Sequence, residues 1–285
     1  MDQGSQGNYD TIELSRVGQV DQSSVVALIR LDRARYRNAQ SRALLRELDH
    51  ALMGAASDPE VRAIVVGSTG ADFSSGHDLR TAQELDDVTT PPMPADLAGR
   101  EAWAWEHWTE PLMRWRRIPK PTIAAVSGNC LWGGWSLAAA MDLRVCSADA
   151  AILPHLSEFF ALPWIIGTRA AREALFLNRV ISADEAFRLG MVSAVCPAGD
   201  DVTLAAVAMA EEIAEVPPQF LRAIKTTLIG IEDMQGFDAS ISLANSQHLI
   251  SEWAHTDPAA QGVAGTDDST SLVASALAKW RASKE

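Results

Sequence analysis

One segment, residues 120–143, restricts the possible folds of this chain more than any other, and its sequence is KPTIAAVSGNCLWGGWSLAAAMDL. It starts with the β-branched and apolar run Thr122–Val126, which predicts a short buried strand. A pair of glycines, Gly133 and Gly134, then opens the alanine-rich, uncharged run Gly133–Met141, which predicts a buried helix. The segment therefore indicates an α/β core in which a strand leads through the glycine pair into a helix.

The start of this helix is suited to binding negative charge. The first amides of a helix have no carbonyl partner within the helix, and the helix dipole adds partial positive charge there. The phosphate-loop pattern GxxxxGK[ST] and the dinucleotide pattern GxGxxG are both absent from the segment. We therefore expect an anion smaller than pyrophosphate, such as an enolate oxygen.

Along the chain, apolar runs alternate with turn residues first, and helical patterns follow. We predict a flexible N-terminal tail over 1–10, an α/β core over 11–200 and a helical region over 201–285. Two strands, 11–14 and 25–31, flank a break with glycine and indicate a hairpin. The other predicted elements are strands at 63–68, 122–126, 143–146 and 191–195, helices at 41–53, 101–117, 133–141, 169–177, 182–189, 204–216, 218–229, 237–253 and 271–280, and loops at 81–99 and 154–164.

Charge and cysteine content exclude several classes of function. The formal net charge is −13 and the pI is about 4.9, which argues against broad binding of nucleic acid. We expect no membrane span, since no stretch of about 18 uncharged apolar residues occurs, and no signal peptide at the polar N-terminus. Cys130, Cys146 and Cys196 are widely spaced in apolar runs, which predicts reduced thiols in a cytoplasmic protein without a metal site.

A second motif, FSSGHDL at Phe73–Leu79, directly follows the predicted strand at 63–68. Gly76 lets the backbone come close to a ligand, so that the amide of His77 can point into a pocket. Taken alone, the pattern is more typical of an ordinary loop after a strand.

Together the two motifs resemble those of the enoyl-CoA hydratase/isomerase family, the crotonase superfamily. The loop motif is similar to the family pattern [FA]-x-[AS]-G-x-D-[LI], and residues 120–142 are similar to KPxIAAVxGxxxGGGxxLAxxxD. Two further matches are LDRARYRNA at 31–39, similar to LNRPxxxNAL, and ISADEAFRLGMVSAVCP at 181–197, similar to ISAxEAxxxGLVxxVVP. The resemblance covers about residues 10 to 250.

The resemblance implies an α/β fold of the ClpP/crotonase type, in which repeated ββα units form a spiral of two near-perpendicular sheets. It implies a C-terminal helical region that packs on a neighbouring subunit, in a homotrimer or a hexamer made of two trimers. It implies an acyl-CoA substrate, with coenzyme A as part of the substrate and no permanently bound cofactor. The expected activity is that of an enoyl-CoA hydratase-type lyase of fatty acid metabolism, without a nucleic acid or membrane partner.

The resemblance also implies an oxyanion hole made of two amides, those of His77 and Gly133, which would hold the thioester oxygen as it becomes an enolate. Each donor of this kind is worth roughly 2.7–4 kcal/mol. The His77 side chain either takes part in acid–base chemistry or serves only through its backbone. The implied coenzyme A and substrate contacts are Arg35, Tyr36, Arg37, His77, Asp78, Leu79, Arg80, Trp132, Gly133 and Ser136. As an alternative, Arg35 and Arg37 are ordinary surface charges without a ligand.

The chain departs from the family at the two glutamates that hydratases use. Ser136 stands at the first position and Leu156 at the second, and the segment around the second is shortened. Glu158 and His155 are the nearby ionisable groups, and each is either a replacement catalytic group or an ordinary loop residue. The alternatives to hydration are isomerisation, thioester hydrolysis, C–C cleavage, or binding of acyl-CoA without hydratase activity.

Tryptophans are concentrated near these motifs. Trp132 and Trp135 flank the glycine pair, and Trp103, Trp105 and Trp108 lie on the helix that follows the 81–99 loop. Large flat side chains at these places either line a pocket for a bulky acyl group or fill the core and a subunit interface.

Overall fold

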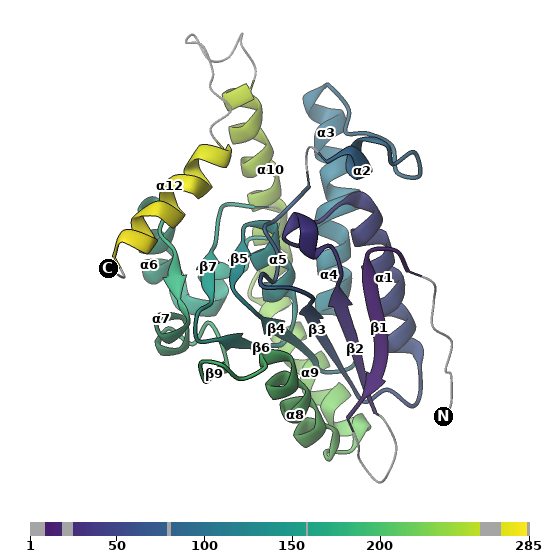
Figure 1. The fold of residues 1–285 in the computed structure, drawn as a ribbon. Coiled ribbons are helices and arrows are strands. Elements are labelled where there is room, and N and C mark those ends of the chain that lie inside the picture. The colour runs from purple at the N-terminus through teal and green to yellow at the C-terminus, as the bar shows by residue number, and fades with distance from the viewer. Residues whose placement is uncertain (1–8, 19–24, 79–80, 158, 257–268, 284–285) are drawn as a thin grey trace.

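The computed structural model describes residues 9–18, 25–78, 81–157, 159–256 and 269–283 (Figure 1). Its main sheet has six strands in the order β1-β2-β3-β4-β6-β9, and a second sheet has the order β5-β7-β8. The strands are β1 (Ile12–Val17), β2 (Val26–Leu31), β3 (Ala63–Ser68), β4 (Thr122–Val126), β5 (Asn129–Leu131), β6 (Leu143–Ser147), β7 (Ala151–Leu153), β8 (Ile181–Ser182) and β9 (Ala194–Cys196).

Helices cover both faces of the main sheet, and one of them, α5, begins at the glycine pair. Between α3 and α4 one turn is a π-helix, η2. The helices are η1 (Ala34–Tyr36), α1 (Arg42–Ser57), α2 (Ala82–Leu85), α3 (Leu97–Ala104), η2 (Trp105–Thr109), α4 (Glu110–Arg116), α5 (Gly133–Ala140), α6 (Leu162–Phe176), α7 (Ala183–Arg188), α8 (Val202–Ala214), α9 (Pro218–Met234), α10 (Phe237–Thr256) and α12 (Ser269–Ala282).

Strands β2, β3 and β4 of the main sheet bury both of their faces, as parallel strands between helices do, whereas the edge strand β1 is partly exposed. Alternate residues of β2–β4, such as Leu28 and Val65, pack under α8, whereas their neighbours, such as Ile29 and Val66, pack with α1, α4 and α5. The hairpin prediction is confirmed, because β1 pairs antiparallel with β2. The other neighbours in the main sheet, in the order β2-β3-β4-β6-β9, pair in parallel.

The ββα units of the predicted crotonase fold are present. In each unit the first strand joins the main sheet, the second joins the small sheet, and a helix follows: β4, β5 and α5, then β6, β7 and α6. The small sheet was not predicted, because its strands have only two or three residues and leave no periodic signal. This alternation carries the chain from β4 through β5 to the N-terminus of α5, where the site is built.

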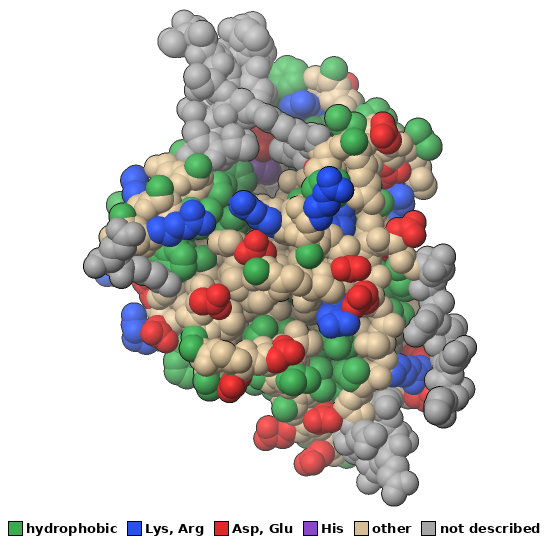
Figure 2. All heavy atoms as spheres, viewed as in Figure 1, with side chains coloured by type: hydrophobic (Ala, Val, Ile, Leu, Met, Phe, Trp, Pro, Cys, Tyr) green, Lys and Arg blue, Asp and Glu red, His purple; other side chains and the backbone are tan. Residues whose placement is uncertain are grey.

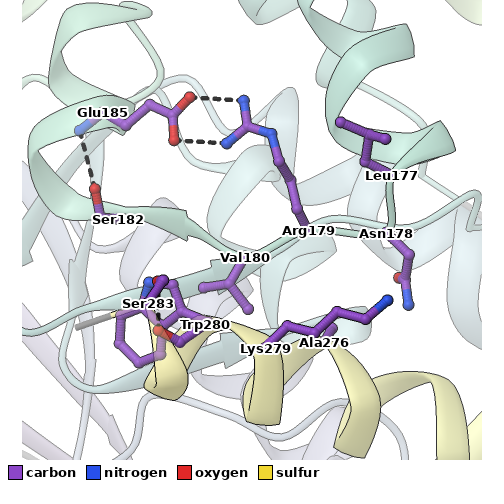
Figure 3. A pocket seen from close by; sticks show the side chains of 10 residues that line it. All are labelled: Leu177, Asn178, Arg179, Val180, Ser182, Glu185, Ala276, Lys279, Trp280 and Ser283. Carbon is purple, nitrogen blue, oxygen red and sulfur yellow. Dashed lines mark hydrogen bonds and ion pairs between the residues drawn. The ribbon is translucent and has the colours of Figure 1, made fainter. Parts of the chain in front are cut away.

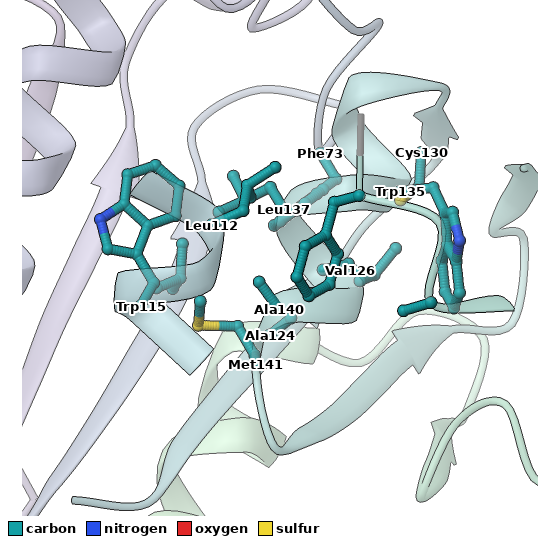
Figure 4. Packing of buried hydrophobic residues seen from close by; sticks show 14 of the residues in the cluster. Phe73, Leu112, Trp115, Ala124, Val126, Cys130, Trp135, Leu137, Ala140 and Met141 are labelled. Carbon is teal, nitrogen blue, oxygen red and sulfur yellow. The ribbon is translucent and has the colours of Figure 1, made fainter. Parts of the chain in front are cut away.

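Helix α5 lies in the centre of the core (Figure 4). Seven of its eight residues are buried, and it has no polar face. Trp135 is 2% exposed and packs in the core with Phe73 and Val126, so of its two predicted alternatives the core role holds.

The C-terminal region packs extensively on the chain's own core. Helix α8 covers one face of the main sheet, and Leu249 of α10 packs with Trp103 and Trp108. Ala276 and Leu277 of α12 pack against strands of the small sheet. The core therefore continues beyond residue 200, and the subunit contact of this region stays a prediction.

Two predicted loops contain helical turns. Within 81–99, Thr81 and Asp96 cap α2 and α3, and each side chain accepts a hydrogen bond from an amide three residues ahead. Within 154–164, α6 already starts at Leu162. The helix is kinked at Gly167, whose φ of 77° is not helical. The sequence pattern predicted only the part from 169 onward.

Candidate active site

The site forms where the loop at Phe73–Leu79 approaches the N-terminus of α5. The amide of Leu131 donates to the carbonyl of Ser74 at 3.0 Å, which ties the loop to β5. A Cβ atom on Gly134 would lie 2.6 Å from the Ser74 carbonyl oxygen, and one on Gly76 would lie 3.4 Å from the amide nitrogen of Gly133. Gly76 also has φ +93°, a conformation that favours glycine.

Backbone pairing orients the two amides predicted to form the oxyanion hole. Gln40 pairs in parallel with His77 through the Gly76 carbonyl and the Asp78 amide, so the His77 N–H points away from the Gln40 backbone. The Gly133 amide belongs to the first turn of α5, where amides have no intrahelical acceptor. The side-chain amide of Gln40 donates to the Gly133 carbonyl at 3.0 Å and fixes that peptide.

The His77 imidazole lies against Gly133. A Cβ on Gly133 would come within 3.1 Å of its Nε2. The ring also stacks on Trp108, with 4.3 Å between ring centroids and 14° between planes. Trp108 reaches this position from η2, whose widened turn precedes Pro111, a residue with no N–H to donate. The aromatic cluster therefore borders the predicted oxyanion hole.

Trp132 occupies the place of the first glycine in the family's GGG triplet, yet it keeps a conformation that suits glycine. Its φ is +48° and its ψ is −109°. Backbone strain in a bulky residue persists only where the surroundings impose it, and it is concentrated at functional sites. Here the Trp132 amide donates to the Leu153 carbonyl at 2.9 Å, and its ring stacks on His155 at 4.3 Å between centroids.

The first of the two family glutamate positions, Ser136, holds a hydroxyl group, and this hydroxyl meets that of Ser157. The Oγ atoms of Ser136 and Ser157 are 3.0 Å apart, and both residues are buried. Leu156, which the sequence placed at the second glutamate position, is thus one residue away from the side chain that meets Ser136. Sequence reasoning did not select Ser157, because the shortened segment hid its register.

A second histidine, His248 of α10, lies next to His155. Their ring centroids are 6.1 Å apart with perpendicular planes. Sequence reasoning did not select His248 either, because nothing local in an amphipathic helix marks which residue faces a distant loop. Glu158, Leu79 and Arg80 lie outside the described residues.

The predicted contacts to the nucleotide end of coenzyme A lie on the surface. Arg35, Tyr36 and Arg37 are exposed on and just after η1, and the Arg35 guanidinium lies 5.5 Å from the Tyr36 ring centre. The Asp78 side chain points inward, where it accepts from Arg33 Nη2 at 2.8 Å and from the Thr81 amide at 3.0 Å. Its carboxylate therefore anchors the loop, and only its backbone remains for the predicted contact.

Other residues of the motifs are structural. The carboxylate of Asp142 accepts from the Thr122 amide at 2.8 Å and from Lys225 Nζ at 2.6 Å. Lys120 Nζ donates to two carbonyls at the end of α1. The three cysteines are free and buried, and burial raises the pKa of Cys146 to about 12.

A cavity of about 440 Å³ lies elsewhere, between α12 and the start of α7 (Figure 3). Its Arg179 side chain bonds both oxygens of Glu185 at 2.6 and 2.7 Å, and the Ser182 hydroxyl caps α7. None of the predicted site residues lines it. Among the described residues, no helix is long and apolar enough to span a bilayer, and no three His, Cys, Asp or Glu residues cluster as metal ligands would.

Comparisons with known proteins agree with this arrangement. Residues 21–262 match the sequence model of the enoyl-CoA hydratase/isomerase family. A Mycobacterium tuberculosis protein named "Putative enoyl-CoA hydratase" is 32% identical over 97% of this chain and 88% of its own length. The mitochondrial Delta(3,5)-Delta(2,4)-dienoyl-CoA isomerase of Rattus norvegicus is 32% identical over 80% of this chain and 72% of its own length.

A solved structure shares the fold over nearly the whole chain. The enoyl-CoA hydratase/isomerase from Xanthobacter autotrophicus Py2 superimposes with a TM-score of 0.76 and 28% identity, over 98% of this chain and 99% of that one. The two glycine-bearing segments, the ββα alternation and these similarities lead to one conclusion. The chain belongs to the enoyl-CoA hydratase/isomerase family and has the crotonase fold.

Proposed function

We propose that the protein binds an acyl-CoA thioester and stabilises its enolate in an oxyanion hole formed by the amides of His77 and Gly133. The observation that supports this most strongly is the close approach of Gly76 to the Gly133 amide, 3.4 Å from an added Cβ. The dipole of α5 adds partial positive charge at the same place. Two such donors together supply roughly 5–8 kcal/mol to a developing oxyanion.

The first candidate reaction is the reversible addition of water to an enoyl-CoA, a lyase reaction. It needs a group that takes a proton from water and returns one to carbon, and we assign this role to His155. Its ring stacks on Trp132, the residue next to Gly133. The hydroxyls of Ser136 and Ser157 both donate and accept, so the pair is suited to hold the reacting water.

The second candidate is isomerisation, and the same serine pair favours it. Hydratases of this family use two carboxylates to activate water and protonate carbon, whereas a proton shift between two carbons needs a single group that reaches both. An imidazole at position 155 suffices for that shift. The similarity to the rat dienoyl-CoA isomerase, at 32% identity, supports the same candidate.

The coenzyme A portion would lie over the 33–40 segment. A guanidinium group can bind two phosphate oxygens at once through two parallel N–H donors. Arg35 and Arg37 are exposed, so they are accessible to the nucleotide end of coenzyme A. We further propose that the backbone of residues 77–80 contacts the adenine and pantetheine portions, with Trp132 and Ser136 facing the acyl group.

The products of an acyl-CoA panel separate the candidates. Loss of the thioester-conjugated absorbance of crotonyl-CoA with gain of one water mass indicates hydration, whereas a changed double-bond position at constant mass indicates isomerisation. Release of free coenzyme A, or of a shortened acyl-CoA, identifies hydrolysis or C–C cleavage instead. Binding without any turnover contradicts the enolate chemistry and leaves an acyl-CoA-binding protein.

A further inference from the structure

Gln40 bonds to both of the segments whose amides form the proposed oxyanion hole. Its backbone amide donates to the Gly76 carbonyl at 2.8 Å, and its backbone carbonyl accepts from the Asp78 amide at 3.0 Å. These two bonds hold the peptides on either side of His77. Its side-chain amide donates to the Gly133 carbonyl at 3.0 Å, although the two residues are 93 positions apart in the chain. One residue therefore connects the loop after β3 with the start of α5.

The backbone pairing also sets the direction of the Gln40 side chain. Residues paired between parallel segments project their side chains to the same side, so the side chains of Gln40 and His77 lie next to each other. Both reach Gly133, because a Cβ atom there would lie 2.9 Å from Gln40 Oε1 and 3.1 Å from His77 Nε2. A carbonyl oxygen only accepts hydrogen bonds, so Nε2 of Gln40 is the atom that faces it. The side chain is thus fixed at its base and at its tip.

The bond between Gln40 and Gly133 is shielded from water. Gln40 is 4% exposed, and Gly133 is buried at the start of α5. A hydrogen bond is electrostatically stronger in such surroundings than in water, and a buried amide is costly unless it is bonded. A side chain that only fills space here needs no amide, and the family pattern LNRPxxxNAL has leucine at this position. The amide of Gln40 therefore calls for a role beyond packing.

We propose that Gln40 is a positioning residue, which holds the amides of His77 and Gly133 at the separation that one thioester oxygen requires. The inference rests on the proposed oxyanion hole. Donors stabilise an oxyanion most when they are fixed in place before the charge develops, and a displacement of more than about 0.5 Å weakens their effect. Gln40 carries no proton to or from the substrate. It acts through the two peptides that it holds.

The test is the infrared stretching frequency of the thioester carbonyl in bound butyryl-CoA that carries a carbon-13 label at this carbon. Hydrogen bonds to the oxygen lower this frequency below that of the free thioester. We expect Q40L and Q40M to lose about half of the wild-type lowering, since one of two donors no longer reaches the oxygen. Methionine is unbranched like glutamine and has no N–H to donate, so Q40M keeps the shape of the side chain better than Q40L.

The affinity for butyryl-CoA should change little in the same variants. Figure 2 shows Lys and Arg side chains in a row across the upper part of the face in view. Such exposed cations, and not Gln40, are suited to hold the phosphates of coenzyme A. The dissociation constant, measured by calorimetry, should therefore stay within about threefold of the wild-type value, because the lost interaction acts mainly on developing charge.

T122V is the control for a lost buried hydrogen bond. The Thr122 hydroxyl bonds the Asp142 carboxylate at 2.8 Å and the Asp142 amide at 3.0 Å. Thr122 is buried at the start of β4, the end of the strand away from the site. The substitution should lower stability as Q40M does, by about 1–3 kcal/mol. The bound thioester should nevertheless keep its wild-type frequency.

The outcomes separate the positioning role from the oxyanion hole itself. A wild-type frequency in Q40M would overturn the positioning role, and a loss confined to Q40L would reduce Gln40 to a packing residue. An equal loss in T122V would also contradict it, because the effect would then follow stability and not the bond to Gly133. If the wild-type complex shows no lowering relative to free butyryl-CoA, the oxyanion hole fails and the role of Gln40 fails with it.

Discussion

Gly133 lies at the place where two loops and one side chain converge. A Cβ atom there would come within 2.9 Å of Gln40 Oε1 and 3.1 Å of His77 Nε2. Both neighbours are held by other contacts, because the Gln40 side chain donates to the Gly133 carbonyl and the His77 ring stacks on Trp108. The geometry of the predicted oxyanion hole thus depends on the absence of one methyl group.

The first prediction is that Gly133→Ala lowers turnover about 100-fold, because the displaced amide no longer reaches the oxyanion. Steady-state kinetics on the wild-type substrate would measure this. Gly54→Ala is the matched control, since a Cβ at Gly54 of α1 meets nothing within 4 Å. The control should keep full activity and gain about 0.5–1 kcal/mol of stability. Equal activity of the two variants would contradict the role of Gly133.

The second prediction concerns the side chain of His77. His77→Ala keeps the backbone amide and removes the ring that stacks on Trp108. We expect kcat within about tenfold of wild type, because the donor to the oxyanion is the amide. A loss of about a thousandfold in a folded variant would instead identify the imidazole as an acid or base.

Sequence motifs selected the parts of the candidate site whose proposed role depends on the local backbone, namely the glycine-bearing loop and the start of α5. They did not identify Ser157 or His248, because the contacts of these side chains depend on where distant elements pack. The strain at Trp132 was equally hidden, since φ +48° follows from the pairing of its amide with Leu153 and not from its own preference.

At the scale of elements, the loop after β3 is held by an ion pair that sequence reasoning did not select. Arg33 and Asp78 are 2.8 Å apart, and both side chains are 3% exposed. Arg33 also donates to the Ala39 carbonyl and to Gln83, so one guanidinium joins the segment after β2, the loop and α2. The pair holds the loop next to His77 against the segment that follows β2.

The third prediction is that Asp78→Ala destabilises the protein by about 3–5 kcal/mol, because it leaves a buried guanidinium without its charge partner. Glu13→Ala is the control, since Glu13 pairs with Arg30 where both side chains are more than 40% exposed. This exposed pair should contribute about 0–1 kcal/mol. Urea unfolding measures both, and equal losses would contradict the anchoring role of Asp78.

Elements with a long periodic pattern were predictable, and short ones were not. Helices α1 and α8 have apolar spacing over several turns, and the buried strands β3 and β4 are unbroken apolar runs. The small sheet and the capped turn at Thr81–Leu85 have too few residues for a period to develop. The sequence Ser182-Ala-Asp-Glu185 has the spacing of a capping box, and half of that box is present: the Ser182 hydroxyl accepts from the Glu185 amide, whereas the Glu185 carboxylate bonds Arg179.

At the scale of the whole molecule, α9 presents an apolar stripe to solvent. Phe220, Ile224 and Leu228 are each more than half exposed, and Ile231 continues the same face at 41%. Exposed apolar residues gathered on one helix face mark an interaction surface. The stripe fits the trimer that the family resemblance implies, with α9 as a subunit contact.

The fourth prediction is that wild-type protein runs as a trimer or hexamer in light scattering, and that Ile224→Asp lowers its mass toward the monomer. Thr226→Asp is the control. Position 226 is two residues from Ile224, about 200° around the helix, so it lies on another face than the stripe, and Thr226 is also exposed. An unchanged mass for Ile224→Asp, or a monomeric wild type, would contradict the assembly role of α9.

The central claim, that the amides of His77 and Gly133 hold the thioester oxygen, is tested most directly by a structure of the complex with a non-hydrolysable acyl-CoA analogue. The predicted result is a carbonyl oxygen about 2.7–3.2 Å from both amide nitrogens, with the acyl chain toward Ser136 and His155. A carbonyl oxygen more than about 4 Å from both nitrogens would contradict the claim, because hydrogen bonds do not extend that far.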